Sequence, residues 1–515
     1  MTKLTNKLNQ QLKNQPMDDF IKEVTDKTWI SKQEFAEDVK RITQQLTALK
    51  IGYQDMVLVS LENSSVYPAI LQALWQQGVI VHPVSESTPV DQLLDEYQIH
   101  HCVGVIIGEQ INLKQTVFVS TTSQLSRKQL TIYGDKEKLA LRTTSPVGKL
   151  SEANLALVMN TSGTTGKPKR VGLTHEQLFN GAKHIANGHQ LTERDTTLVT
   201  MPMFHINAQV ISILATRLTD GRLLVAKKFS AHQFWQQVAD NQGTWASVVP
   251  TIISILLMNL SAQKEYQKYQ KKLQLRFIRS ASFSLPKNKL EEFQTVFDVP
   301  VIEGYGLTEG ASQVAINPHD APKAGSVGKP YGTEIKIFDG TELIEDSQQL
   351  GEIAVRGDHV ITDYLDPNPT SFFGEWFLTG DLGYFDEEGY LYIKGRKKEM
   401  INRGGEKIAP VQVEGALNKL SFIAQIAVVG LDDPLYGEEV TAVVISRASG
   451  ISEAKQRQAI FDYSERKLAR YERPTRVEFV KEFPTNPTGK VIRAKLKEII
   501  QTKISERVEN ETASA

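Results

Sequence analysis

Cysteine and net charge are both scarce in this chain of 515 residues. The single cysteine, Cys102, excludes a disulfide within the chain, and a protein without disulfides fits a reducing compartment. We therefore expect a cytoplasmic location. The 59 lysine and arginine residues balance 60 aspartate and glutamate residues, so the formal net charge is -1. This balance gives no general reason to expect a nucleic-acid partner, and we predict none.

The sequence also lacks a hydrophobic segment long enough to cross a bilayer. Its longest apolar stretch, residues 245–256, is short and is interrupted by Pro250 and by hydroxyl side chains. The first residues, MTKLTNKLNQQLKNQPMDD, have no apolar core of the kind that secretory signals contain. We expect no integral membrane association.

Short β-rich runs alternate with helical patterns through the N-terminal part of the chain, as in residues 56–60, 67–77 and 198–200. This alternation predicts an α/β fold with mixed and largely parallel sheets covered by helices. Farther on, glycine-rich turns and short strands predict a small antiparallel, β-barrel-like part, followed by a small α+β unit. We therefore predict an N-terminal domain of residues 1–395 and a C-terminal domain of residues 396–515.

The first concentrated chemical signal is a run of glycines, hydroxyls and lysines. It consists of Thr161, Ser162, Gly163, Thr164, Thr165, Gly166, Lys167, Pro168 and Lys169. A buried strand is expected before it, and Thr174 with Gln177 fits a capping box after it, so we expect the run to link a strand to a helix. Glycines let backbone amides converge on an anion, which predicts phosphate binding. It is not a Walker loop, because too few residues separate Gly163 from Gly166. A flexible surface turn is the alternative.

This run resembles the signature loop of the adenylate-forming superfamily, which includes acyl-CoA synthetases, aryl-CoA ligases, luciferases and peptide-synthetase adenylation domains. That family usually has glycine where this chain has Arg170. Further segments that resemble family motifs follow in the same order along the chain. They are residues 304–309, 376–381, 394–399, 403–407 and 484–490.

The resemblance implies a set of nucleotide contacts. The loop would bind the phosphates of ATP, Tyr305 and Gly306 would contact adenine, and Ser282 would lie beside the base. Asp381 would bind the ribose diol, with Arg396 near it. Thr308 would contact a phosphate. Glu309, a hard-oxygen ligand, would bind Mg²⁺ together with Thr161.

The resemblance also assigns residues to catalysis and to domain motion. Lys490 would be the catalytic lysine of a loop in which Thr485 replaces the usual arginine. The C-terminal domain would be mobile about a hinge near Lys398, and Gly405 would border the pantetheine tunnel. His205 would border the carboxylate site, with packing against an apolar helix as the alternative.

These features together predict an ATP-dependent carboxylic acid–CoA ligase. The acid and ATP would give an acyl-adenylate and pyrophosphate, and coenzyme A would then give acyl-CoA and AMP. We expect ATP, Mg²⁺ and coenzyme A as cofactors, and a small carboxylic acid and CoA as partners. A homodimer is left open. The alternatives are an enzyme that loads a carrier protein, a luciferase-like oxidase and a catalytically silent nucleotide-binding protein.

The identity of the acid stays open in the sequence. Residues 201–207 contain no aspartate to hold a substrate ammonium, which resembles ligases of simple carboxylic acids. Ser280–Ser284 resembles oxalate–CoA ligases, whereas residues 229–235 resemble fatty-acid or carnitine-type ligases. The neighbours His100, His101 and Cys102 suggest a metal, but we expect no further ligand nearby and predict a strand edge without function.

Overall fold

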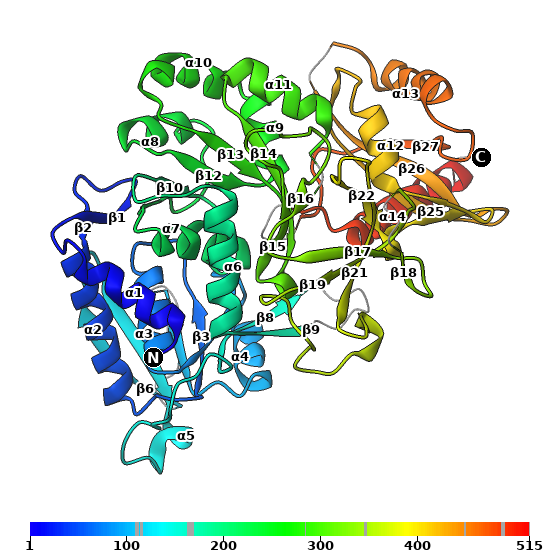
Figure 1. Ribbon diagram of the computed structural model, residues 1–515. Helices are drawn as coiled ribbons and strands as arrows, with labels where there is room; N and C mark the ends of the chain where they lie inside the picture. The colour runs from blue at the N-terminus through cyan, green and yellow to red at the C-terminus, as the bar shows by residue number, and fades with distance from the viewer. Residues whose placement is uncertain are drawn as a thin grey trace.

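The computed structural model describes residues 1–108, 113, 117–161, 169–283, 285–344, 348–447, 450–485 and 490–513; for 507–513 only the backbone is described. Within these residues the strands form four sheets (Figure 1). Two large mixed sheets are followed by a small antiparallel sheet and by a separate C-terminal sheet. The predicted fold class is confirmed.

The first large sheet has the order β6-β7-β5-β3-β4-β8-β9. Its strands are β3 (Met56–Ser60), β4 (Ile80–Pro83), β5 (Gly104–Ile107), β6 (Phe118–Gln124), β7 (Gln129–Asp135), β8 (Leu155–Thr161) and β9 (Lys169–Thr174). The central strands β5, β3, β4 and β8 are parallel, and the edges are antiparallel. Val57 and Leu58 belong to different apolar clusters on the two faces, so β3 is buried on both sides.

The second large sheet has the order β16-β15-β14-β13-β12-β10-β11-β1-β2. Its strands are β1 (Asp19–Glu23), β2 (Ile30–Ser31), β10 (Thr196–Val199), β11 (Arg222–Val225), β12 (Trp245–Val248), β13 (Phe277–Ser280), β14 (Val301–Leu307), β15 (Ser312–Ile316) and β16 (Lys329–Pro330). The strands from β14 to β1 are parallel. Loops at their carboxyl ends are therefore brought to one edge, where α/β proteins commonly bind ligands.

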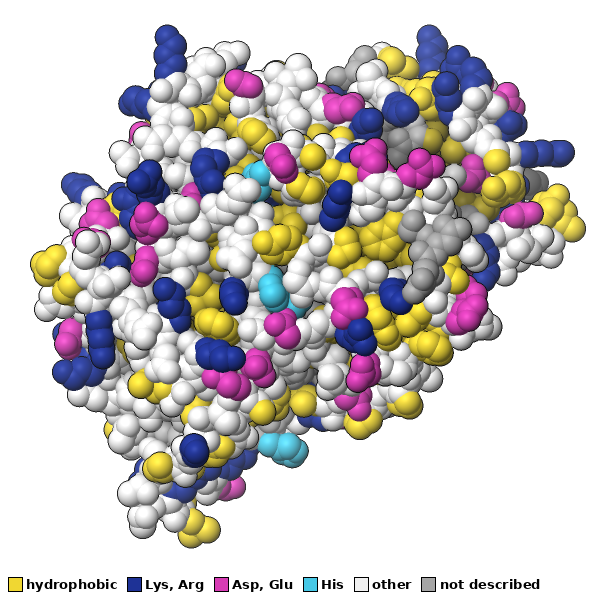
Figure 2. Space-filling view, viewed as in Figure 1, with side chains coloured by type: hydrophobic (Ala, Val, Ile, Leu, Met, Phe, Trp, Pro, Cys, Tyr) yellow, Lys and Arg dark blue, Asp and Glu magenta, His cyan; other side chains and the backbone are white. Residues whose placement is uncertain are grey.

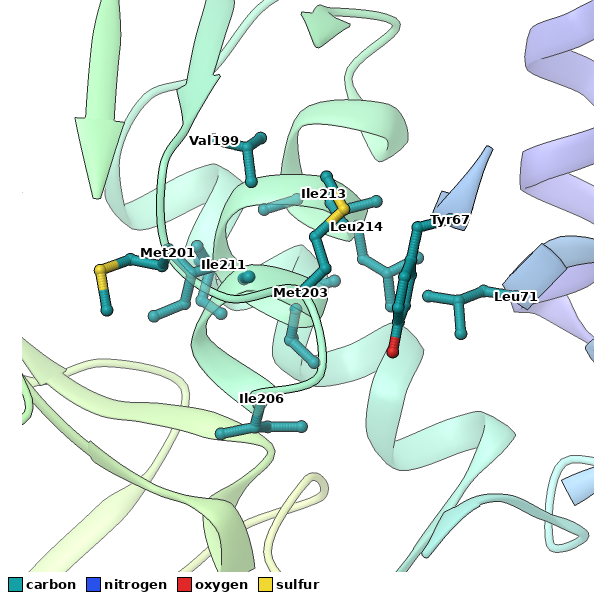
Figure 3. Packing of buried hydrophobic residues seen from close by; sticks show 14 of the residues in the cluster. Tyr67, Leu71, Val199, Met201, Met203, Ile206, Ile211, Ile213 and Leu214 are labelled. Atoms are coloured by element: carbon teal, nitrogen blue, oxygen red, sulfur yellow. The ribbon is translucent and has the colours of Figure 1, made fainter. Parts of the chain in front are cut away.

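Helices pack between and around these sheets. Those of the N-terminal part are α1 (Lys3–Lys13), α2 (Lys32–Ala48), α3 (Tyr67–Gln76), α4 (Val90–Ile99), α5 (Lys136–Ala140), α6 (His175–Gly188), the π-helix η1 (Asn207–Leu214), α7 (Ala215–Leu218), α8 (Phe234–Asp240), α9 (Pro250–Met258), α10 (Leu260–Tyr269), η2 (Gln270–Lys272), α11 (Lys287–Phe297) and η3 (Thr308–Gly310). Helix α6 contacts strands of both sheets, and η1 contacts α6 and the second sheet. Figure 3 shows Tyr67 and Leu71 of α3 beside apolar side chains of η1 in this shared core.

The structure corrects the predicted surroundings of the signature loop. Strand β8 pairs antiparallel with β9, Thr161 lies opposite Lys169, and α6 begins only after β9. The loop therefore links two strands rather than a strand and a helix. The reason is that Val171 and Leu173 alternate with more exposed residues, a period-2 pattern that suits an edge strand. The predicted capping box of Thr174 and Gln177 is confirmed at the start of α6.

The remaining chain forms two smaller sheets. The antiparallel sheet contains β17 (Glu334–Phe338), β18 (Leu343–Ile344), β19 (Gly351–Arg356), β20 (Phe372–Phe373), β21 (Trp376–Phe385) and β22 (Leu391–Arg396), with η4 (Pro369–Ser371) beside it. After η5 (Lys397–Glu399) the C-terminal sheet contains β23 (Ile401–Arg403), β24 (Glu406–Ile408), β25 (Ile423–Asp433), β26 (Gly437–Ser446) and β27 (Arg476–Phe479). Its helices are α12 (Pro410–Leu417), α13 (Glu453–Lys467) and α14 (Arg493–Ala513). The chain changes sheets between Arg396 and Ile401. Among the described residues, no helix is both long and apolar enough to cross a membrane.

Candidate active site

A cleft of about 290 Å³ lies between the N-terminal sheets and the C-terminal sheet. The N-terminal side contributes Ser282, Tyr305 and Asp381, and the C-terminal side contributes Lys490 and Arg493. In Figure 1 the orange and red C-terminal segments lie beside β22 and across from α11. Residues from distant parts of the sequence therefore meet in one site.

The Asp381 carboxylate is the centre of the cleft. The Tyr305 hydroxyl donates to its Oδ2 at 2.6 Å, and Arg396 Nε lies 2.8 Å from its Oδ1. Burial raises the pKa of Asp381 above its ordinary value, although the Arg396 guanidinium and the Tyr305 hydroxyl oppose this shift. Three predicted nucleotide residues, from β14, β21 and β22, are thus in direct contact.

Lys490 reaches the same carboxylate from the C-terminal side. Burial and the nearby Arg396 charge lower the pKa of Lys490, while Glu399 and Asp381 oppose the shift. The adjoining Arg493 forms ion pairs with Glu399 at 3.1 Å and with Glu414 at 2.6 Å. The lysine is consequently held over the cleft by a segment that is anchored both to the C-terminal sheet and to η5.

A second charged group surrounds Glu309. The Tyr364 hydroxyl donates to Glu309 Oε1 at 2.8 Å, and Lys169 Nζ lies 4.5 Å from the centre of the Tyr364 ring. Burial raises the pKa of Glu309, while the Tyr364 hydrogen bond and the Lys169 charge oppose this shift. The half-buried Thr161 faces Lys169 across the β8–β9 pair, and Thr308 precedes Glu309 in η3. The predicted metal ligands and a loop lysine therefore come from neighbouring segments.

Part of the predicted phosphate loop lies outside the described residues. This part is Ser162, Gly163, Thr164, Thr165, Gly166, Lys167 and Pro168. Arg170, which replaces the family's usual glycine, donates to both carboxylate oxygens of Asp366 at 2.7 and 2.5 Å. The Arg170 side chain thus forms a salt bridge with Asp366 beside the loop.

Gly306 and Ser282 have unusual backbone requirements. A Cβ on Gly306 would lie 1.5 Å from the backbone oxygen of Ser312, so only glycine fits where β14 and β15 approach. Ser282 has a φ of 85°, in the left-handed region, and is exposed at the cleft. Gly405, at φ 92°, is exposed in the β23–β24 turn of the C-terminal sheet.

His205 precedes the π-helix η1, a rare element that is frequent at functional sites. Its ring packs against Phe204 with centroids 4.2 Å apart. Burial lowers the pKa of His205 to about 4, so the imidazole is neutral at physiological pH. In the described part of the chain its buried Nε2 has no hydrogen-bond partner. This neutral ring remains able to bind a ligand.

The sequence did not identify three residues that the structure places around the site. Tyr364 and Arg493 hold Glu309 and the Lys490 segment, and both lie outside the recognised motifs. The third, Arg279, is 1% exposed in β13 beside the cleft residue Ser280. An arginine inside the otherwise buried strand FIRS was the available signal, because buried charges are rare unless they serve a partner.

Known proteins share this arrangement. The AMP-binding enzyme family matches residues 8–365, and the AMP-binding enzyme C-terminal domain matches residues 412–490. The sulfoacetate–CoA ligase of Cupriavidus necator is 38% identical over 347 residues, which is 66% of each chain. A probable CoA ligase of Humulus lupulus is 32% identical over 91% of each chain. The o-succinylbenzoate CoA synthetase of Bacillus subtilis, solved with its acyl-adenylate, has a TM-score of 0.78 and 25% identity over 96% of this chain and 98% of that one.

The chain belongs to the adenylate-forming AMP-binding enzymes. It is an AMP-forming acid–CoA ligase, and the predicted ATP, Mg²⁺ and coenzyme A are confirmed as its cofactors. Its substrates are a small-molecule carboxylic acid and CoA, and loading of a carrier protein is not favoured.

Proposed function

We propose that this ligase activates a small acid that carries a second anionic group besides the reacting carboxylate. The observation that supports this proposal is the buried cation Arg279 behind the cleft. Its Nε donates to Gln313 Oε1 at 3.2 Å, and its guanidinium also donates to Ser247 Oγ at 3.4 Å. Ser247 in turn donates to Asn207 of η1 at 3.0 Å, so polar groups fill the space between η1 and the cleft.

Arg279 has no carboxylate partner among the described residues, although a buried charge is costly unless it is paired. Burial lowers the pKa of Arg279 to about 9, so the guanidinium is still protonated at pH 7. An anionic substituent on the substrate would supply the missing countercharge. A long hydrocarbon chain in this place would leave the cation and its neighbouring polar groups without partners.

The named substrates of two relatives agree with this preference, whereas those of a 31% identical long-chain-fatty-acid–CoA ligase of Mycobacterium tuberculosis do not. Sulfoacetate carries a sulfonate besides its carboxylate, and o-succinylbenzoate carries two carboxylates. The sequence resemblance to oxalate–CoA ligases points to the same class, whereas the fatty-acid resemblance does not. A second anionic group on the substrate would pair with the buried Arg279, and the named substrates of these two relatives carry such a group.

In the proposed first step, a carboxylate oxygen attacks the α-phosphorus of ATP and pyrophosphate leaves. Ionised Asp381 accepts hydrogen bonds from the ribose, and Lys490 places its ammonium where negative charge develops. Glu309 and Thr161 fit Mg²⁺ because both offer hard oxygen donors, and Thr161 lies opposite Lys169 of β9, the strand that contacts η3. A bound Mg²⁺ supplies positive charge to the phosphate oxygens.

In the proposed second step, the CoA thiol attacks the acyl carbon of the adenylate and AMP leaves. The neutral His205 ring borders the acyl site and limits access to it until the adenylate has formed. Lys490 would occupy space that the thiol approach needs, so we propose that the C-terminal domain, residues 396–515, turns about a hinge near Lys398. Gly405 would then reach the pantetheine tunnel.

Figure 2 shows basic and acidic side chains interspersed over the visible face, without a large region of one sign. Together with the net charge of -1, this supports the proposal of a cytoplasmic enzyme without a nucleic-acid partner.

Replacement of Arg279 by methionine tests the substrate proposal. We expect Arg279→Met to lower kcat/KM for sulfoacetate or a short dicarboxylate about 10–100-fold, because a hydrogen bond to a charged group contributes ~1.5–3 kcal/mol. The kcat/KM for a short monocarboxylate should change little. CoA-dependent pyrophosphate release, measured across a panel from oxalate to palmitate, gives both values.

Arg276→Met is the matched control, since it removes the same charge from a half-exposed side chain that pairs with Asp195 at 3.1 Å. It should leave the ratio between dianionic and monoanionic acids unchanged. A wild-type preference for long-chain acids, or an equal loss for all acids in Arg279→Met, would refute the proposed substrate class.

Lys490→Ala should slow acyl-adenylate formation about 10²–10³-fold, because its ammonium stabilises charge only in the first transition state. Thioester formation from a supplied acyl-adenylate should remain near the wild-type rate. Pyrophosphate release and thioester formation are measured separately, with the exposed Lys495→Ala as the control. Equal damage to both half-reactions contradicts this role.

Lys398→Pro tests the hinge, because proline fixes its own φ and disfavours the helical region at Lys397. We expect near-normal pyrophosphate release but a loss of about tenfold or more in CoA transfer, since that step needs the domain rotation. Lys398→Ala removes the same charge without the backbone restriction and should transfer CoA normally. Full thioester activity in the proline variant would exclude the hinge.

A further inference from the structure

Two histidines and a glutamate converge on the outer side of the first large sheet, away from the ligase cleft. His82 lies in β4, Glu96 lies in α4, and His100 follows the last residue of that helix. Glu96 and His100 are four residues apart and so share one helix face. Glu96 Oε2 is 3.1 Å from His82 Nε2 and 3.3 Å from His100 Nε2. This finding corrects the expectation that no further ligand lies near His100, His101 and Cys102.

The hydrogen bonds fix the state of His82. Its Nδ1 lies 3.0 Å from the backbone oxygen of Val158, and because a carbonyl only accepts, Nδ1 carries a proton. In the neutral ring, Nε2 then carries no proton, and its lone pair faces Glu96 Oε2. That carboxylate oxygen already accepts from Asn160 Nδ2 at 2.7 Å. Two acceptors that face one another require a cation between them, either a proton or a metal ion.

His100 favours the metal ion. The residue is 4% exposed, its Nε2 pairs with Glu96 Oε2, and its buried Nδ1 has no hydrogen-bond partner within the described residues. Its ring stacks on His82 with centroids 3.8 Å apart and planes 25° apart. One divalent cation would be bound by a ring nitrogen of His82, a ring nitrogen of His100 and the carboxylate of Glu96.

We propose that His82, Glu96 and His100 bind a divalent transition-metal ion of the Zn²⁺ type. Two imidazole nitrogens and one carboxylate oxygen are a donor set that suits Zn²⁺, with bonds of about 2.0–2.2 Å. Tetrahedral bonds of that length separate donor atoms by about 3.3–3.6 Å, a little longer than the nitrogen–oxygen distances of 3.1 and 3.3 Å here. The Val158 carbonyl orients His82 as an outer-shell partner. Glu96 is 27% exposed, which leaves a side for water as the fourth ligand.

The position of this metal site indicates a bracing role. Asn160 bonds to Glu96 and directly precedes Thr161, where the signature loop begins. A metal ion on His82 and His100 would therefore tie α4 and β4 to the end of β8. A second group, His184, Asp358 and His359, has the same residue types. In that group His359 Nε2 lies 3.0 Å from the backbone oxygen of Gln313, and its Nδ1 lies 3.2 Å from Asp358. Both ring nitrogens of His359 thus have partners, whereas His100 Nδ1 has none among the described residues.

The test is metal binding by the full chain. The purified protein is stripped with a chelator and titrated with Zn²⁺ by calorimetry, and bound zinc is counted by mass spectrometry. We expect one tight equivalent and a higher Tm with zinc in the wild type, a loss of affinity of about tenfold or more in His100→Gln and in Glu96→Gln, and little or no rise of Tm with zinc in these two variants. His101→Gln, an exposed neighbour, and His184→Gln, from the second group, should bind as the wild type does.

A measurement on the unaltered chain does not depend on the folding of any variant. Co²⁺ bound to the wild type should give the absorption of a four-coordinate nitrogen and oxygen site. Failure of the wild type to bind stoichiometric metal would overturn the proposal and leave a proton-sharing cluster. Retention of zinc by a correctly folded His100→Gln, or its loss in His184→Gln, would overturn it as well.

Discussion

The Asp381 carboxylate is the interaction on which the arrangement of the active site depends. It is buried, and a buried charge is stable only where other groups neutralise it. Tyr305 of β14 and Arg396 of β22 provide this from two different sheets, and Lys490 approaches from the segment before α14. The same carboxylate thus lies where the two parts of the chain meet, and in the proposed function it holds the ribose. Because Lys490 lies in the segment before α14, the proposed rotation of the C-terminal domain would remove it without disturbing the contact between Tyr305 and Asp381.

The site contains both compensated and uncompensated charge. Lys169 and Tyr364 accompany Glu309, and Arg396 acts on Asp381 and Glu309 together. Arg279 differs, since its partners in the described residues are neutral. In the proposed function the paired groups serve the nucleotide chemistry that all acids have in common. The cation Arg279 determines which acid is accepted, because the proposal has the substrate supply its countercharge.

The sequence alone predicted the family, the fold class and the positions of Tyr305, Asp381 and Arg396, because these residues lie in short contiguous motifs. The β8–β9 hairpin was not predicted. The capping box of α6 indicates a helix soon after the loop, and the edge strand β9 that lies between them is short. Arg279 was not recognised, because its significance depends on the absence of a nearby carboxylate. The pairing of His82 with His100 depends on how β4 and α4 pack. The two histidines are 18 positions apart in the sequence, and no motif links them.

The most direct measurement is a crystal structure with a stable sulfamoyl analogue of the adenylate of a short dianionic acid. The account predicts that the ribose diol binds Asp381, that Lys490 Nζ contacts the linkage that replaces the phosphate, and that the second anionic group pairs with Arg279. An analogue whose ribose lies away from Asp381, or whose second anionic group points to solvent with Arg279 unpaired, would contradict it.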